Sequence, residues 1–268
     1  MFNLTKEEKK LLKLEKKNEK LNKEEAKEEK RLEEYNQNAP KRIKKEKKKE
    51  LHRQINEAPK RSVLEEIGNA VSHGVGAIFA IIALVLMLIK ANTGLEIASA
   101  IIYGFCMFMT MLNSCLYHAF KCGSTVKRIW RRFDYSAIYL LIGGTFAPLF
   151  LVFMEQYNST LAITLFVLQW IVIIFGITMN GIFGPGRIKI LNYILYFAVG
   201  WGGVLFIPYF INHNITLLIY ILVGGIVYTL GMIPFAFKKI KVTHFIFHLV
   251  ILIACIIQFS GIFICLYC

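Results

Sequence analysis

Residues 242–265 read VTHFIFHLVILIACIIQFSGIFIC, and this stretch decides the fold. It contains no Asp, Glu, Lys or Arg, and it is longer than the roughly 20 apolar residues that a helix needs to cross a bilayer. An open sheet would leave backbone groups unpaired in lipid, and the apolar segments of this chain lack the alternation of barrel strands. Six similar segments precede it, at residues 67–89, 97–120, 133–154, 161–179, 188–211 and 215–237. The sequence therefore predicts an all-α integral membrane protein built as a seven-transmembrane helix bundle.

The charged residues are concentrated before these segments. Residues 1–61 contain 21 Lys/Arg and 13 Asp/Glu, a net charge of +8, whereas residues 62–268 contain only 11 and 5. So few charges would leave a water-soluble domain without enough polar surface, which indicates lipid as the surrounding medium. We therefore expect two parts: a charged, Lys/Glu-rich cytoplasmic arm at residues 1–61, partly helical or disordered, and a seven-helix membrane domain at residues 62–268.

The arm itself allows two interpretations. Its leucine register breaks at Asn18 and Glu25, which disfavours a coiled coil, and Pro40 is predicted to end its first helical segment. The basic run at residues 41–49 is either a solvated tail or a segment that docks onto anionic lipid headgroups. A nucleic-acid partner is not expected, because the basic residues are not interleaved with aromatic residues on a folded module.

The loops predict the orientation in the membrane. One side of the bilayer would carry ten basic loop residues and the other only Lys90, so the N-terminus is predicted to be cytoplasmic and the C-terminus outside. This is opposite to rhodopsin-type receptors. With no cleavable signal pattern at its start, the chain is expected to be a multi-pass protein of the cell membrane. The ten residues are Lys121, Lys127, Arg128, Arg131, Arg132, Arg187, Lys189, Lys238, Lys239 and Lys241.

The few polar residues of the membrane segments share one depth. His118 ends the second segment, His244 and His248 begin the seventh, and Asp134, the sole aspartate of the chain, begins the third. At a rise of about 1.5 Å per residue, these residues all lie within roughly 10–12 Å of the cytoplasmic boundary. His244 and His248 are four residues apart, so both rings project from one helix face. Three imidazoles with one open position are typical of a catalytic zinc site, although iron and nickel are chemically allowed.

Further polar residues accompany this set. Ser114 lies one turn before His118, and Glu66, Asn69 and His73 lie along the first turns of the first segment. Asp134 could orient a ligand or take a proton from water, with Ser114 beside it, whereas Glu66, Asn69 and His73 are expected to support the ligands from outside.

Alternatives remain open for each member of the set. The His244 and His248 pair could reach the headgroups instead, and His118 could face the basic loop. Asp134 could cap a helix or pair with a neighbouring arginine, and Ser114 could be a packing hydroxyl. His73 could be a ligand or form a hydrogen bond between helices.

These residues lie in motifs that resemble a known family, the bacterial haemolysin-III-like proteins. That family belongs with the progestin and adiponectin receptors in a superfamily that includes alkaline ceramidases, and the resemblance covers roughly residues 62–265. The motifs, in order, are EEIGN at 65–69 with SHG at 72–74, SCLYH at 114–118, FDYSAIY at 133–139 and HFIFH at 244–248.

The resemblance implies a function as well as a fold. It implies a zinc ion near the cytoplasmic face, held by His118, His244 and His248, with Ser114 and Asp134 beside the metal-bound water. Members of the superfamily hydrolyse lipid amides, receive hormones or maintain membrane lipids, and the haemolysin name reflects a cytolytic activity.

We therefore expect a zinc-dependent hydrolase or sensor that acts on membrane lipids. Two alternatives are a non-enzymatic homeostasis protein with structural zinc and a cytolytic, pore-forming haemolysin.

Overall fold

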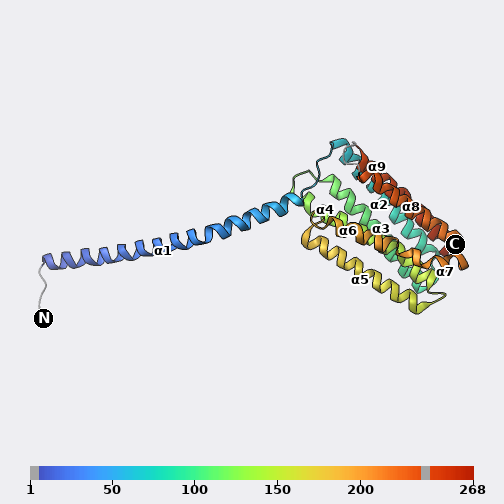
Figure 1. Ribbon diagram of the computed structural model, residues 1–268, viewed down its shortest axis with the longest axis horizontal. Helices are drawn as coiled ribbons and strands as arrows, with labels where there is room; N and C mark the ends of the chain where they lie inside the picture. Colours follow the sequence, from blue (N-terminus) through green and yellow to red (C-terminus); the bar gives the residue numbers. More distant parts are fainter. Residues whose placement is uncertain (1–5, 237–241) are drawn as a thin grey trace. The chain divides into compact units, whose positions relative to one another are not determined.

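The computed structural model describes residues 6–236 and 242–268, and the chain forms two compact units, Met1–Ile55 and Asn56–Cys268. Seven helical segments of the second unit are long and apolar enough to cross a membrane and lie together as a bundle (Figure 1). Within the described residues the secondary structure is all helical. The predicted all-α, seven-span membrane fold is confirmed.

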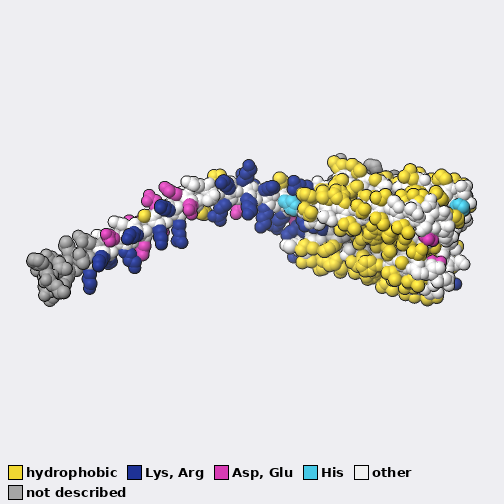
Figure 2. All heavy atoms as spheres, turned by 90° about the horizontal axis from the view of Figure 1, so that it is seen from below, with side chains coloured by type: hydrophobic (Ala, Val, Ile, Leu, Met, Phe, Trp, Pro, Cys, Tyr) yellow, Lys and Arg dark blue, Asp and Glu magenta, His cyan; other side chains and the backbone are white. Residues whose placement is uncertain are grey.

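The first unit is one long helix. Helix α1 spans Lys6–Ile55 and continues through Pro40, so the prediction that Pro40 ends a segment is wrong. A proline removes one backbone donor, and on this exposed helix the carbonyl of Asn36 is left accessible rather than buried without a partner. Many Lys and Arg side chains line the length of α1, whereas the visible face of the bundle is largely hydrophobic (Figure 2).

The spans of the bundle follow in chain order. The first two are α2 (Val63–Lys90) and α3 (Gly94–Ala119), and the third joins α4 (Thr125–Pro148) to the π-helical turn η1 (Leu149–Met154). Helix α5 (Ser159–Phe183) is the fourth, and α8 (Ile215–Ala236) and α9 (Thr243–Leu266) are the sixth and seventh. The predicted end of the sixth at Phe237 and the basic residues Lys238, Lys239 and Lys241 lie outside the described residues.

The third span begins eight residues earlier than the hydropathy pattern predicts. Ser124 caps α4 by accepting a hydrogen bond from the backbone N–H of Lys127, and the charged residues that follow are helical. Asp134 therefore lies in the third turn of the helix, which excludes the alternative that it caps the helix. Pro148 ends the α-helical part, and the π turn continues the span.

The fifth span is interrupted. It consists of α6 (Lys189–Gly200), the short 3₁₀ segment η2 (Gly202–Phe206) and α7 (Ile207–His213), where the sequence predicted one helix over 188–211. Gly200, Gly202 and Gly203 surround the interruption, and glycine is a poor helix former. Pro208 lies in the first turn of α7, where a missing N–H costs nothing.

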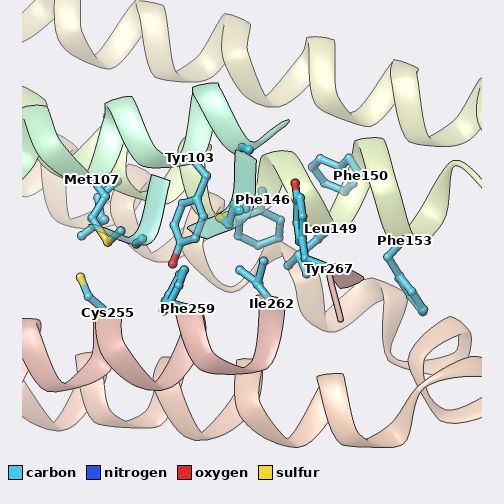
Figure 3. Close-up of a cluster of buried hydrophobic side chains, with 14 of the residues drawn as sticks. Tyr103, Met107, Phe146, Leu149, Phe150, Phe153, Cys255, Phe259, Ile262 and Tyr267 are labelled. Carbon is cyan, nitrogen blue, oxygen red and sulfur yellow. The ribbon is translucent and has the colours of Figure 1, made fainter. Parts of the chain in front are cut away.

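The third span is the centre of the bundle. In its most apolar stretch of 18 residues, 83% is buried inside the protein, against at most 44% for the corresponding stretch of any other span. Glycines allow this enclosure, because a Cβ at Gly143 would collide with Ile173 of α5 and one at Gly144 with Cys106 of α3. In the buried cluster of Figure 3, Phe259 and Ile262 of α9 point toward Tyr103 and Phe146. Asp134 is thus carried by the most enclosed helix.

Candidate metal centre

Three histidines from two spans meet at one point. The Nε2 atoms of His244 and His118 are 3.3 Å apart, and those of His248 and His244 are 3.0 Å apart. One ring nitrogen of each lies within 4.8 Å of the others. His118 and His248 are buried and His244 is half-buried. These three residues form a possible three-His metal site, which supplies the geometry that the sequence predicted.

The spacing of these nitrogens fits a metal ion. With Zn–N bonds of 2.0–2.1 Å, two ligands of a tetrahedral ion lie about 3.3 Å apart, close to the observed separations. Three Nε2 atoms that converge cannot all be satisfied by hydrogen bonds among themselves, because each bond needs one donor and one acceptor. The donor set therefore fits a metal such as zinc, and the identity of the metal stays a prediction.

Helix α2 orients His118 through the ring nitrogen Nδ1, which does not belong to the cluster. The carboxylate oxygen Oε2 of Glu66 is 2.6 Å from Nδ1 of His118, and the side-chain amide of Asn69 lies 3.4 Å from the same nitrogen. A carboxylate accepts but does not donate, so His118 donates from Nδ1 and keeps the lone pair of Nε2 for the cluster. His118 faces these groups, not the basic loop that the sequence left open as an alternative.

Asp134 and Ser114 border the same point from α4 and α3. Both line a cavity of about 210 Å³ together with His73, His244 and His248. The hydroxyl of Ser114 is buried and makes no well-formed hydrogen bond within the described residues, although it interacts with the nearby carboxylate of Asp134. The neighbouring Arg131 donates to the backbone carbonyl of Glu57 at 2.9 Å. The structure thus brings the predicted acid and hydroxyl to the histidine cluster.

His73 packs against the cluster without joining it. Its ring centroid is 3.9 Å from that of His248, and both of its ring nitrogens are buried and make no well-formed hydrogen bond among the described residues, although the ring interacts with the backbone of His248. It is not among the three residues whose ligand atoms converge. His73 therefore lines the cavity next to the cluster and does not close it.

The cavity extends away from the histidines through mainly apolar surroundings. Ile142 and Thr145 of α4, Trp201 beside η2 and Gln258 of α9 line its more distant part. Thr145 is 11 residues beyond Asp134, which corresponds to about 16 Å along a helix. The cavity therefore runs from the histidines along the third span between mainly apolar side chains.

Comparisons with known proteins agree with this picture. Residues 61–259 match the model of a family described as haemolysin-III related. The chain belongs to the haemolysin-III-related family. It is 36% identical over 197 residues to "Hemolysin-3" of Bacillus cereus, covering 71% of this chain and 86% of the relative. It is also 35% identical over 191 residues to "Hemolysin-3 homolog" of Bacillus subtilis (strain 168), covering 70% and 87%.

One residue of this haemolysin-III-related protein escaped the sequence reasoning. Lys127 is only 1% exposed, and its Nζ lies 2.9 Å from Oε1 of Glu66, the carboxylate that holds His118. In the sequence Lys127 is one of several basic residues between two spans, and only its position three residues after the capping Ser124 could have placed it on a helix. That it is buried depends on the neighbouring helices.

Proposed function

We propose that this haemolysin-III-related protein is a metal-dependent membrane hydrolase, or a sensor derived from one, that acts on an amide or ester bond of a membrane lipid and contributes to membrane homeostasis. The observation that carries the proposal is the apolar cavity that His244 and His248 of the three-His cluster line together with Asp134 and Ser114. We place this end of the bundle at the cytoplasmic face of the cell membrane, because the loop charges favour that orientation.

The residues present would share the work as follows. When bound, a zinc ion would act as a Lewis acid that polarises a carbonyl and makes water acidic enough to lose a proton near neutral pH. Asp134 would accept that proton, since it lines the cavity at the cluster. Ser114 would donate a hydrogen bond to the oxygen on which negative charge develops, because its hydroxyl is buried and otherwise poorly bonded.

The cavity would receive the acyl chain. Its distant walls come from apolar and weakly polar side chains, and an extended chain of about 12 carbons spans the 16 Å from Asp134 to Thr145. Burial of each CH₂ group stabilises binding by about 0.8 kcal/mol relative to water, but a lipid that arrives from the bilayer already has an apolar environment. The cavity therefore serves mainly to position the scissile bond and select chain length.

Filling the distant part of the cavity, beside Trp201, is expected to change chain-length selectivity. Gly225 lines the cavity, and a Cβ there would meet only Trp201 at 3.9 Å, so Gly225→Leu should fold normally and project into the space. We expect release of long-chain fatty acid from lipid amides and esters to fall about tenfold or more, while short-chain substrates react nearly as before.

The measurement is mass spectrometry of the fatty acid released by the metal-loaded protein from matched series of ceramide-like amides and phospholipids. Gly181→Leu is the control, because a side chain at Gly181 would enter open space outside the cavity. If the native protein releases no fatty acid beyond a chelated sample, the hydrolase proposal is wrong. If Gly225→Leu and Gly181→Leu behave alike, the cavity is not the acyl site.

A non-enzymatic role with structural metal is the second candidate. It is favoured by one observation, the buried ring of His73 next to His248, whose nitrogens make no well-formed hydrogen bond, because a fourth protein ligand would close the site. The absorption spectrum of the cobalt-substituted protein in the presence and absence of a small inhibitor anion separates the two, since only an open site changes its spectrum. The name of the Bacillus relatives suggests cytolysis as a further role, which we rank below both.

A further inference from the structure

A buried lysine beside the metal centre has no role in the chemistry proposed above. The ammonium of Lys127 lies 2.9 Å from Oε1 of Glu66, donates to the backbone carbonyl of Phe120 at 3.0 Å, and sits 4.9 Å from the centre of the Tyr117 ring. A charge taken out of water is costly unless it is paired and hydrogen-bonded, and these three contacts with the ammonium serve that purpose.

Glu66 connects this lysine to the cluster. Its two carboxylate oxygens have different partners: Oε1 faces Lys127, and Oε2 faces Nδ1 of His118 at 2.6 Å. The two partners come from different helices, α4 and α3, whereas Glu66 belongs to α2. With one oxygen held by the ammonium, the plane of the carboxylate is fixed, and with it the direction in which Oε2 accepts.

We propose that Lys127 is a positioning residue of the metal centre. It holds the Glu66 carboxylate, which accepts the Nδ1 proton of His118 and so leaves the Nε2 lone pair directed at the ion. This inference rests on the metal site of the proposed function. It adds a residue that touches neither the ion nor the substrate.

The test compares metal binding by the full-length protein and its Lys127→Met variant. We expect Lys127→Met to weaken Zn²⁺ binding about 10- to 100-fold in competition with a chelator, and to shift the visible absorption bands of the Co²⁺-substituted protein. Lys121→Met is the matched control, because Lys121 precedes α4 by only a few residues but is exposed. Lys127→Arg, which keeps a cation, should recover part of the affinity.

A double-variant cycle separates positioning from a general loss of structure. If Lys127 acts through Glu66, the pair Lys127→Met and Glu66→Gln should bind metal no more weakly than Glu66→Gln alone. Additive losses would assign Lys127 an independent structural role and overturn the inference. Unchanged affinity and spectrum in Lys127→Met would also overturn it while leaving the three-His site intact. If the native protein binds neither Zn²⁺ nor Co²⁺, the metal site itself is wrong.

A second, independent feature is the charge pattern of α1. At 3.6 residues per turn, eight exposed basic side chains fall within a sector of about 80°, and we call them the basic face. Glu34 is the only acidic residue of that sector within residues 16–49. The apolar residues Leu21, Leu32 and Ile43 lie in a different sector. The basic face consists of Lys16, Lys20, Lys23, Lys27, Arg31, Lys41, Lys45 and Lys49.

We infer that the basic face docks onto an anionic bilayer surface. Its charges recur about once per turn over residues 16–31 and again over residues 41–49, as docking along a planar array of lipid phosphates requires. The chain enters its first membrane span at Val63, only 14 residues after Lys49. The short connection to the first span therefore keeps the basic face near the bilayer surface. A second copy of the face carries the same sign of charge and would be repelled.

Proteolysis of the full-length protein in nanodiscs tests this docking. The protease is glutamate-specific, because variants that replace only lysines then keep the same cleavage sites in α1 as the native protein. We expect cleavage there to be about tenfold slower in discs with anionic lipid than in neutral discs, and the difference to disappear at high salt. The triple variant Lys20→Gln, Lys27→Gln, Lys45→Gln should lose most of the protection.

The matched control removes the same charge from other sectors, as Lys17→Gln, Lys44→Gln, Lys47→Gln, and should keep most of the protection. Equal cleavage in neutral and anionic discs would overturn the inference. So would equal effects of the two triple variants, because net charge rather than a face would then be responsible. Protection that depends on protein concentration and not on lipid would assign the face to a protein partner.

Discussion

The His118→Ala and His248→Ala variants are expected to lose nearly all bound metal. The native protein should carry about one ion per chain after purification with its own metal, because three imidazole nitrogens converge at the spacing of zinc ligands. With one nitrogen removed, two ligands remain, and affinity should fall by several orders of magnitude. Elemental analysis of the purified proteins by mass spectrometry measures the effect directly.

A histidine outside the cluster provides the control for this result. His213 ends α7, where it is exposed and stacks on Tyr157 at 3.7 Å between ring centres. His213→Ala removes the same side chain and should leave the metal content unchanged. If native protein, His118→Ala and His213→Ala carry equal amounts of metal, the ion is bound elsewhere and the centre described above is wrong.

The second large effect is expected at Asp134. The change Asp134→Asn keeps the size of the side chain but removes its ability to accept a proton, so turnover of a lipid substrate should fall about 100- to 10,000-fold. Metal content should stay near the native level, because Asp134 is not among the converging ligands. Release of fatty acid and metal content are measured on the same preparation.

Ser136→Ala serves as the matched control for Asp134. Ser136 lies two residues further along α4 and does not line the cavity, so its removal should leave turnover within a few-fold of the native protein. Full activity in Asp134→Asn would exclude a proton-accepting role. Loss of the metal together with activity would instead make Asp134 a ligand and support the structural-metal alternative.

The sequence predicted the spans well because membrane insertion depends on local composition. A run such as residues 242–265 has to be a buried or lipid-facing helix wherever it sits in the fold. The start of α4 was missed for the same reason, since hydropathy excludes the charged residues 127–132 although Ser124 caps a helix there. The break after Gly200 was also missed, because glycine lowers helix propensity without fixing where a helix will stop.

The sequence could predict which residues of the candidate site lie at the same depth in the bilayer. His118, His244 and Asp134 lie at similar distances from the ends of their segments, and a bundle of upright helices brings such residues to one level. Depth does not give rotation about the helix axis, so the sequence could not show that Glu66 faces His118 or that Lys127 faces Glu66. The cavity likewise depends on which side chains leave space, which only the packed helices determine.

The enclosure of the third span has a consequence for motion. Asp134 belongs to the helix that the others surround. In the fifth and sixth spans, by contrast, only 6% and 22% of the most apolar 18-residue stretch is buried inside the protein. The far end of this span, residues 143–154, is buried without a break, so a tilt of the helix that carries Asp134 would displace several neighbours at once. The outer spans meet mostly lipid, and the interrupted fifth can bend at its glycines. We therefore expect any movement that widens the cavity to occur in the outer spans, while the third span stays in place.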